Sequence, residues 1–516
     1  MPDAGPDRAT ARKAIALLTG AAGFTEHRPP PSPLPPDGPL GWAGYDAARE
    51  RASARTGEEE SVLYGTGVVG DRACVLLSFE FGFLGGSLGR QTGDRLAAAY
   101  ELALARRLPL VALVATGGSR MQEGMIALTQ LQRVAAASVR LRAAGLPQIA
   151  VVRDPTTGGG WATVGAGADV VLALPGAQVG FAGSRVRPPD ADPYAYSAEG
   201  QFEAGQVDAV VPADELTAAV THWLRALGPH EDLPAAPVPR ALSVAGAPVP
   251  RALSAGGTES AAGAGTGAGA GTGAGAGTGA GAGTGAGAAK GSGAGTGPGA
   301  GTPSAADSGP AVPLPETGRE AVARARDPRR PRAEAYLADY FAVRLPLHGD
   351  RSGSTDPGLL CGFGLRGDGQ PVAYVAQCGT PTRPAGYRAA ARTIRLADRL
   401  GVPVLTLVDT PGAANDAGAE RAGAGAAIAD TFAAVAAARV PVTTLVIGEG
   451  GSGGALALAA PDNTHVTVDS YFSVIAPELA AAILKRPPSE TGATADQLRL
   501  RPQDLVDLGF ARSIVG

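Results

Sequence analysis

The sequence twice places a short glycine run where an apolar, strand-like segment gives way to a helix-like one. The first case is AVVRDPTTGGGWA at 150–162, and the second is VIGEGGSGGAL at 446–456. Each contains a glycine pair, Gly158–Gly159 and Gly453–Gly454. Glycine at such a corner permits unusual backbone angles and lets another molecule approach the bare main chain. One corner in each half predicts two similar units of alternating strands and helices.

The two corners also indicate a chemistry. The first N–H groups of a helix have no partner inside it, and the helix dipole adds positive potential beside them. Two corners can therefore stabilise two developing negative charges, which indicates enolate or oxyanion chemistry. The alternative is that the glycines only allow close packing. A phosphate-binding loop is disfavoured because neither corner has the G-x-x-x-x-G-K-[ST] spacing, and the G-x-G-x-x-G pattern is poorly met.

Composition bounds the remaining possibilities. A chain of 516 residues exceeds one ordinary core, so we expect two or more domains. With 45% hydrophobic residues and a net charge of −4, it is globular and shows no sign of nucleic-acid binding. Cys74, Cys361 and Cys378 lie far apart, which excludes a Cys₄ zinc ribbon and disfavours a disulfide framework. Without a signal segment or a run of 18 apolar residues, we expect a cytoplasmic protein.

Shifts in composition divide the chain into four parts. Residues 1–41 are polar and proline-rich, and we expect a flexible N-terminal segment. Residues 42–228 form a first globular domain and residues 315–516 a second. Between them we expect a disordered low-complexity linker over 229–314, because from about 254 to 312 the sequence degenerates into AGAGTG repeats that have nothing to bury.

Both globular parts alternate short apolar runs with helical stretches. This alternation predicts parallel β structure covered by helices, and two diverged copies of one α/β fold in a pseudo-twofold arrangement. The predicted strands and helices, in chain order, are a strand in 108–118, a helix in 121–145, strands in 147–155 and 168–175, a strand in 401–413, a helix in 428–440 and a strand in 440–451.

The order of motifs resembles the carboxyltransferase of bacterial acetyl-CoA carboxylase, with its beta and alpha subunits fused in one chain. The beta-like segments are FEFGFLGGSLG (79–89), ATGGSRMQEG (115–124), AGLPQIAVVRDPTTGG (144–159) and VGFAGSRV (179–186). The alpha-like segments are HGDR (348–351), AGYRAAARTIRLADRLGVPVLTLVDTPGA (385–413), GAERAG (418–423), VIGEGGSGGAL (446–456) and YFSVIAPE (471–478). The resemblance implies a crotonase-like ββα-superhelix fold in both domains.

The resemblance also implies a reaction. The family moves a carboxyl group from N-carboxybiotin, held by a separate carrier protein, to acetyl-CoA and so forms malonyl-CoA. Negative charge then develops on the biotin ureido oxygen and on the thioester oxygen, so two oxyanion holes are needed. The released biotin anion can take the proton, which removes the need for a protein base. His348, in HGDR, is accordingly expected to be a structural or hydrogen-bonding residue rather than a base.

The family's cofactors and partners follow from the same resemblance. It implies no covalently bound cofactor and no zinc, with a biotin carboxylase and a biotin carboxyl carrier protein as separate partners. The acyl acceptor is acetyl-CoA or another acyl-CoA. A homodimer is implied, and neither nucleic acid nor a membrane is an expected partner.

Site residues carry over position by position. The oxyanion holes correspond to Gly158 and Gly159, facing acyl-CoA, and to Gly453 and Gly454, facing biotin. Glu123 and Glu449 are not expected to be catalytic. A structural ion pair is the alternative for Arg120. Substrate-binding loops correspond to Gly85, Gly86, Gly117, Gly118 and Arg120 in the first domain, and to Thr410, Pro411, Gly412 and Ala413 in the second.

Several positions depart from the family pattern. The zinc ribbon that often heads the beta subunit is missing, Trp161 stands where small residues are usual, 377–388 is short, and 414–416 lack the usual aromatic residue and proline. Trp161 is expected to narrow the first pocket. These departures leave the acyl specificity and some CoA phosphate contacts open.

Two other functions remain open. A carboxyltransferase of the malonate decarboxylase type shares the fold and would act on a malonyl thioester. A non-catalytic paralogue would keep the fold for assembly alone. The DTPGA and VIGEGGSGGAL segments favour the carboxylase, and the retention of both glycine pairs is evidence against a non-catalytic paralogue.

Overall fold

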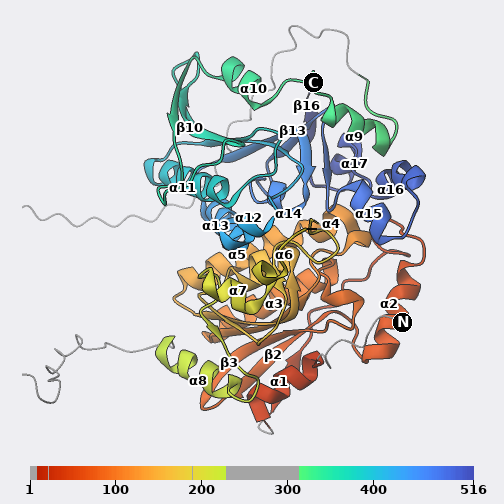
Figure 1. The fold of residues 1–516 in the computed structure, drawn as a ribbon, viewed down its shortest axis with the longest axis vertical. Coiled ribbons are helices and arrows are strands. Elements are labelled where there is room, and N and C mark those ends of the chain that lie inside the picture. The colour runs from red at the N-terminus through yellow and green to blue at the C-terminus, as the bar shows by residue number, and fades with distance from the viewer. Residues whose placement is uncertain (1–8, 21–22, 189, 228–312, 516) are drawn as a thin grey trace, which may run out of the picture. The chain divides into compact units, whose positions relative to one another are not determined.

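The computed structural model describes residues 9–20, 23–188, 190–227 and 313–515 (Figure 1). Residues 1–230 and 310–516 belong to one compact unit. The linker predicted over 229–314 lies outside the described residues, apart from its last two positions.

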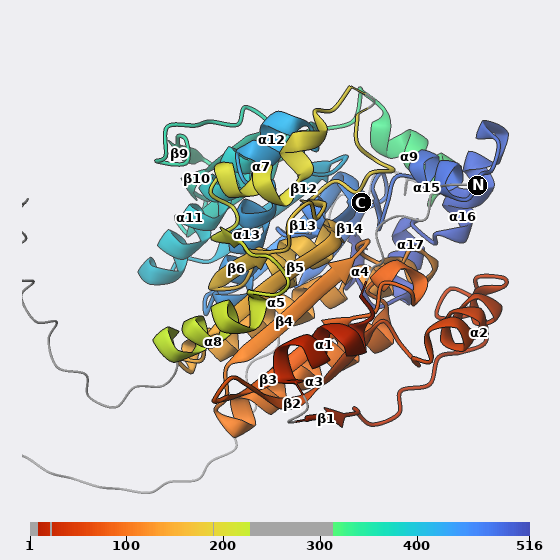
Figure 2. The ribbon, with the colours of Figure 1, turned by 60° about the horizontal axis from the view of Figure 1, so that its bottom comes forward.

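The first half is built on a mixed eight-stranded sheet, seen in the lower part of Figure 2. Its strand order is β1-β2-β3-β4-β5-β6-β8, with the short β7 beside the end of β5. Strands β3 to β6 and β8 are parallel, as predicted, whereas β1, β2 and β3 pair antiparallel. The strands are β1 Phe24–His27, β2 Val62–Val69, β3 Arg72–Phe79, β4 Leu110–Thr116, β5 Gln148–Thr157, β6 Val170–Ala173, β7 Val179–Gly180 and β8 Ala209–Val210.

Helices cover both faces of this sheet. β4 is buried along its whole length, which suits a parallel strand with helices on both sides. Alternate side chains of the sheet pack on α3 and α5 on one face and on α1 and α8 on the other. The helices are α1 Ala11–Thr19, α2 Tyr45–Thr56, α3 Arg90–Arg106, α4 Gly124–Leu128, α5 Gln130–Ala143, α6 Gly158–Gly160, α7 Ala198–Glu203 and α8 Leu216–Leu227, with short 3₁₀ or π turns at Leu84–Gly86, Met121–Glu123, Trp161–Gly165 and Pro193–Tyr196.

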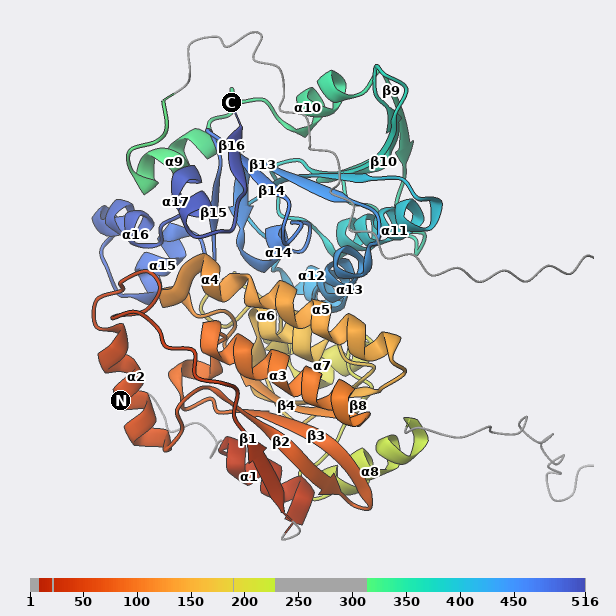
Figure 3. The same ribbon diagram turned by 180° about the vertical axis from the view of Figure 1, so that it is seen from behind.

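The second half repeats the same sheet (Figure 3). Its order from β9 is β9-β10-β11-β12-β13-β14-β16, with β15 beside the end of β13, so each strand has a counterpart in the first half. This topology confirms the predicted pair of diverged copies. The strands are β9 Val343–Leu347, β10 Leu359–Leu365, β11 Pro371–Gln377, β12 Val404–Thr410, β13 Val442–Gly451, β14 Thr464–Thr467, β15 Tyr471–Ser473 and β16 Ser513–Val515.

The helices of the second half include one long element, α11, whose last turn ends at the left-handed Gly401. In the first half, the single helix predicted over 121–145 is divided at Thr129, and Gly145, with φ 72°, follows its end as expected. The described helices of the second half are α9 Gly318–Arg326, α10 Ala333–Tyr340, α11 Pro384–Leu400, α12 Ala417–Arg421, α13 Ala424–Ala437, α14 Ser452–Leu456, α15 Pro477–Ile483, α16 Thr491–Gln497 and α17 Pro502–Asp507, with a 3₁₀ turn at Pro488–Glu490.

The prediction of a flexible segment over 1–41 is wrong for the residues of α1 and β1, which belong to the fold of the first half. α1 buries Ala14, Ile15 and Leu18 against the first sheet, and β1 adds a strand to that sheet. The Arg153 guanidinium donates a 3.0 Å hydrogen bond to the Ala9 carbonyl and so fastens the start of α1. Proline marked this segment as flexible, but α1 precedes the proline run.

The two halves contact each other through helices. α5 packs against α13 (Figures 1 and 3). One cluster of buried apolar side chains includes residues of both halves. Gln132 on α5 donates a 2.7 Å hydrogen bond from Nε2 to the Ala459 carbonyl. Among the described helices, none is both long and apolar enough to cross a membrane.

Candidate active site at the two glycine corners

The first corner lies at the end of β5. The strand ends at Thr157, Gly158 takes a left-handed conformation with φ 66°, and α6 begins there. The Gly158 N–H donates a 3.1 Å hydrogen bond to the Phe181 carbonyl. This N–H is therefore engaged, and Gly159 carries the next first-turn N–H of the corner.

The second corner repeats this backbone path. β13 ends at Gly451, Ser452 is left-handed with φ 57°, and α14 begins there. Gly453 is thus the structural counterpart of Gly159, and Gly454 that of Gly160. The two glycine pairs chosen from the sequence are consequently offset by one position, because the second corner has serine where the first has Gly158.

The predicted loops of the first half gather at its corner. A Cβ added at Gly118 would lie 3.8 Å from the Gly159 nitrogen. Gly117 donates its N–H to the Gly85 carbonyl at 2.9 Å, and a Cβ at Gly86 would lie 2.1 Å from the Ala115 carbonyl oxygen. Gly85 and Gly86 therefore lie against the end of β4 and the loop that follows it, and Gly118 lies against the corner itself.

The DTPGA loop has the same place in the second half. The Gly412 N–H donates to the Thr410 hydroxyl at 3.1 Å, as the Gly118 N–H does to the Thr116 hydroxyl at 3.1 Å. A Cβ added at Gly454 would lie 2.4 Å from the Ala413 nitrogen. The loop and the corner are thus in direct backbone contact.

The two corners approach each other within one chain. A Cβ added at Gly159 would lie 2.5 Å from Cδ1 of Leu131, and one added at Gly453 would lie 3.4 Å from the same methyl group. Leu131, on α5, is fully buried. The ring of Phe181 would lie 3.7 Å from the Gly453 Cβ position. One leucine side chain therefore separates the corners.

Arg120 is placed differently from the loop glycines. Its side chain is fully buried and forms ion pairs with Glu60 at 2.6 Å and Glu123 at 3.3 Å. Burial alone would lower the pKa of Arg120, but these carboxylates hold it above its ordinary value. Burial alone would raise the pKa of Glu60, but Arg120 keeps it below its ordinary value. This arrangement favours the structural alternative for Arg120.

Trp161, which was expected to narrow the first pocket, is buried in the apolar interior. Its side chain is 1% exposed and packs between β5, β6 and their neighbours. A Cβ added at Gly425 would lie 2.1 Å from its Nε1. The tryptophan therefore fills the contact between the first half and α13.

Sequence reasoning missed Glu420. Its side chain extends from α12 and accepts hydrogen bonds from the Phe181 N–H at 3.1 Å and the Ala182 N–H at 2.9 Å. Burial raises the pKa of its carboxyl to about 7. The only sequence signal is an acidic residue in the small-residue segment GAERAG, and it does not reveal a partner more than 200 positions away.

The comparisons with known proteins match both halves. The family described as "Carboxyl transferase domain" matches residues 41–209, and that described as "Acetyl co-enzyme A carboxylase carboxyltransferase-like" matches residues 316–516. The "Acetyl-coenzyme A carboxylase carboxyl transferase subunits beta/alpha" of Saccharopolyspora erythraea is 35% identical over 513 residues, covering 96% of this chain and 75% of that protein. The chain belongs to this carboxyltransferase family.

Further carboxyltransferases are similar over most of the chain. A "Probable biotin-dependent acyl-coenzyme A carboxylase beta3 subunit" of Mycobacterium bovis is 31% identical, covering 91% of this chain and 82% of that protein. The structure of transcarboxylase 12S is 18% identical, with a TM-score of 0.37, and covers 98% of this chain and 87% of that one. The family matches include both corners of this carboxyltransferase.

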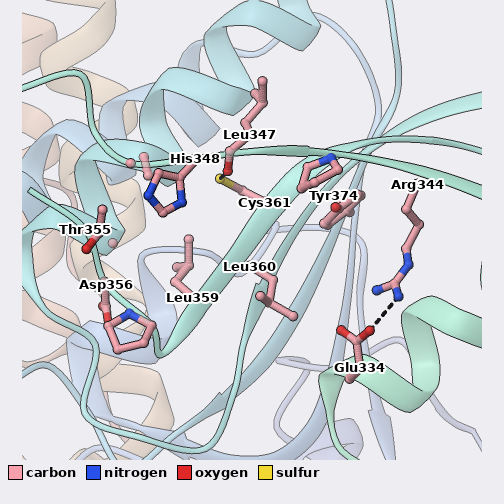
Figure 4. Close-up of a pocket in the computed structure, with 15 residues that line it drawn as sticks. Glu334, Arg344, Leu347, His348, Thr355, Asp356, Leu359, Leu360, Cys361 and Tyr374 are labelled. Carbon is pink, nitrogen blue, oxygen red and sulfur yellow. Dashed lines mark hydrogen bonds and ion pairs between the residues drawn. The ribbon is translucent and has the colours of Figure 1, made fainter.

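A separate cavity of about 560 Å³ lies in the second half of the carboxyltransferase (Figure 4). His348 lines it, and Arg344 and Glu334 form a 2.5 Å ion pair at its edge. On α11, Gly386 lines this cavity, whereas the hydroxyl of the next residue, Tyr387, donates a 2.9 Å hydrogen bond to the Gly454 carbonyl. The residues that line this cavity include none of the glycine corners, so His348 lies in a pocket distinct from them.

Proposed function

We propose that this carboxyltransferase moves the carboxyl group of N-carboxybiotin to acetyl-CoA and forms malonyl-CoA, a step of fatty-acid synthesis. The observation that carries this proposal is the approach of two equivalent strand-to-helix corners across Leu131 in one chain. Two carbonyl-type oxygens gain negative charge during the transfer, and backbone N–H groups can stabilise both.

The first corner is the proposed hole for the thioester oxygen. The Gly158 N–H is bonded to Phe181 and holds the corner in shape, so Gly159 supplies the next first-turn donor. The adjoining loop glycines, Gly85, Gly86, Gly117 and Gly118, let the acyl-CoA approach the main chain. Arg120 is omitted from the proposed contacts because it is buried in ion pairs.

The second corner is the proposed hole for the biotin ureido oxygen. Gly453 is the counterpart of Gly159, and Gly454 continues the first turn of α14. The loop Thr410–Ala413 lines the same side. No histidine lies in either corner, which accords with a reaction in which the biotin anion itself takes the α-carbon proton.

The proposed partners are separate proteins. Carboxybiotin would arrive on a biotin carboxyl carrier protein that a biotin carboxylase has charged. We also propose a homodimer, by analogy with a two-alpha, two-beta assembly. Light scattering on the purified chain would give twice the monomer mass of 51.1 kDa, and a monomer at working concentration would contradict this part.

The reverse reaction tests the function. The purified chain should transfer the carboxyl group of malonyl-CoA to free biotin or biocytin, and should release acetyl-CoA. Comparison with methylmalonyl-CoA and longer carboxylated thioesters gives the acyl preference. Turnover of only a carrier-bound malonyl thioester would favour the malonate decarboxylase type. Absence of turnover with every thioester would favour the non-catalytic paralogue.

A further inference from the structure

Glu420 connects the second half of the chain to the first corner. The residue lies on α12, and its side chain is 1% exposed. Its two carboxylate oxygens each accept one main-chain N–H, from Phe181 and Ala182. A carboxylate that accepts two backbone donors makes charge-assisted hydrogen bonds, which are roughly twice as strong as neutral ones.

The peptide group between Phe181 and Ala182 passes this contact on to the corner. Its N–H, that of Ala182, is held by Glu420, while its carbonyl, that of Phe181, accepts the Gly158 N–H at 3.1 Å. The Phe181 ring would also lie 3.7 Å from the Cβ position of Gly453. A shift of this peptide therefore changes the corner that carries Gly159.

We propose that Glu420 is a positioning residue of the carboxyl transfer, which holds the Phe181–Ala182 main chain and thereby orients the N–H groups of the first corner. This inference rests on the proposed function. Glu420 itself touches no reacting atom in this account. The second half would thus set the geometry of the hole in the first half, and a misplacement of about 1 Å can cost about 10²-fold in rate.

Charged groups around Glu420 come from each element packed on it. Asp416 and Arg421 belong to its own helix or that helix's start, and Arg421 is ion-paired with Asp192 of the first half. Arg187 donates from Nε to the Ala182 carbonyl at 3.0 Å, and its guanidinium lies 4.1 Å from the ring centre of Tyr196. Burial raises the pKa of Glu420 to about 7, although Ala182, Phe181 and Arg187 oppose this shift.

The ionised carboxylate accepts both N–H groups, whereas protonation leaves one oxygen carrying its own hydrogen. Turnover by the unsubstituted chain should therefore rise as pH increases through about 7. Stability should change in the opposite direction. Because the folded-state pKa is raised, the contribution of Glu420 to stability is complete below its ordinary pKa of 4.5 and is lost as pH rises through about 7.

Two substitutions and one matched control test this role in the full-length chain. E420A removes both acceptors, and E420Q retains one amide oxygen for an N–H. R421A is the control, because it removes the ion pair with Asp192 on the same helix and leaves the Phe181–Ala182 contact intact. The readouts are kcat and KM for malonyl-CoA-dependent carboxylation of biotin from pH 6 to 9, and amide hydrogen exchange at 158–182.

E420A should lower kcat at least about tenfold, with a change in KM of less than about threefold, because positioning affects the transition state more than binding. E420Q should recover part of the loss and lack the rise through pH 7. Exchange at Phe181 and Ala182 should quicken in E420A and not in R421A. Equal losses in E420A and R421A, or full activity in E420A, would overturn this inference alone. An unsubstituted chain without turnover would overturn the proposed function as well.

Discussion

Gly453 and Gly454 are adjacent, yet the space around them differs. A Cβ at Gly453 would make ordinary contacts of 3.4 and 3.7 Å with side chains, whereas one at Gly454 would lie 2.4 Å from the Ala413 nitrogen. We therefore expect G453V to fold normally but to lose at least about 10²-fold in kcat, the scale for one hole donor. G454V should lose thermal stability as well. Melting curves and the biotin carboxylation assay separate these effects.

A folded G453V chain with full activity would contradict the proposed role of the second corner. G159V is the corresponding change in the first half, where the added Cβ would meet Leu131 at 2.5 Å. A leucine side chain can move, so G159V should fall between the other two variants in stability while losing a similar factor in kcat.

Arg120 offers a test of structure rather than chemistry. R120A would leave Glu60 and Glu123 buried without their cation, which costs about 3–5 kcal/mol of unfolding free energy. Because the pKa of Glu60 is lowered in the folded chain, its contribution to stability is present above about pH 4.5 and is lost as pH falls below that value. Denaturant unfolding at pH 7 and pH 4 should show this dependence in the unsubstituted chain and not in R120A. An unchanged midpoint at pH 7 would contradict the ion-pair role.

At the level of single residues, the sequence predicts where the two corners lie but not which residues of one correspond to which residues of the other. Glycine runs after apolar segments locate both turns, since few other residues suit such positions. The equivalence of Gly158 with Ser452 depends on backbone angles that a non-glycine residue rarely adopts, and no local pattern signals it. Glu420 was missed for a different reason, because its partners are brought near only by the packing of the two halves.

Among the secondary-structure elements, α1 differs most from the expectation. Its apolar side chains recur at helical spacing, and Thr10 caps the helix by accepting the Lys13 N–H at 3.2 Å. The sequence was divided at residue 41 by its composition, so the short helical pattern of α1, which lies beside the proline run, was not recognised. The buried strands β4, β5, β12 and β13 were predictable because continuous apolar runs bounded by turn residues are typical of parallel strands.

The contribution of α1 can be measured with two leucines of the same helix. Leu18 is 1% exposed and belongs to the apolar core between α1, α8 and the sheet, whereas Leu17 is 44% exposed. L18A should therefore cost about 2–5 kcal/mol in unfolding free energy. L17A should change it by less than about 0.5 kcal/mol. Similar midpoints for the two variants in urea would mean that α1 does not pack as described.

In the whole molecule, the contacts between the two halves should hold them together even when the chain between them is interrupted. Separately expressed fragments 1–253 and 313–516 should bind each other, because buried apolar residues of both halves share one cluster and Glu420 and Gln132 cross between them. Activity should return with the concentration dependence of a bimolecular association, since a tether only raises the effective concentration of one half near the other.

Co-purification of the fragments and titration of activity would measure this association. A tight but inactive complex would show that the segment between the fragments does more than connect them. Fragments that fail to associate even at high concentration would contradict the shared core itself.

Leu131 packs against both corners and so couples them sterically, although the chemistry proposed at each corner is separate. Its Cδ1 methyl group would touch a Cβ placed at either corner, so any displacement of this side chain changes the room available on both sides. In the proposed reaction, decarboxylation of N-carboxybiotin and enolisation of the thioester are distinct events, and the corners assigned to them share Leu131 as a packing partner. A substitution that repacks Leu131 cannot tune one event alone. We therefore expect the effects of substitutions at Gly159 and Gly453 to be non-additive, since neighbours that share a packing partner do not contribute additively.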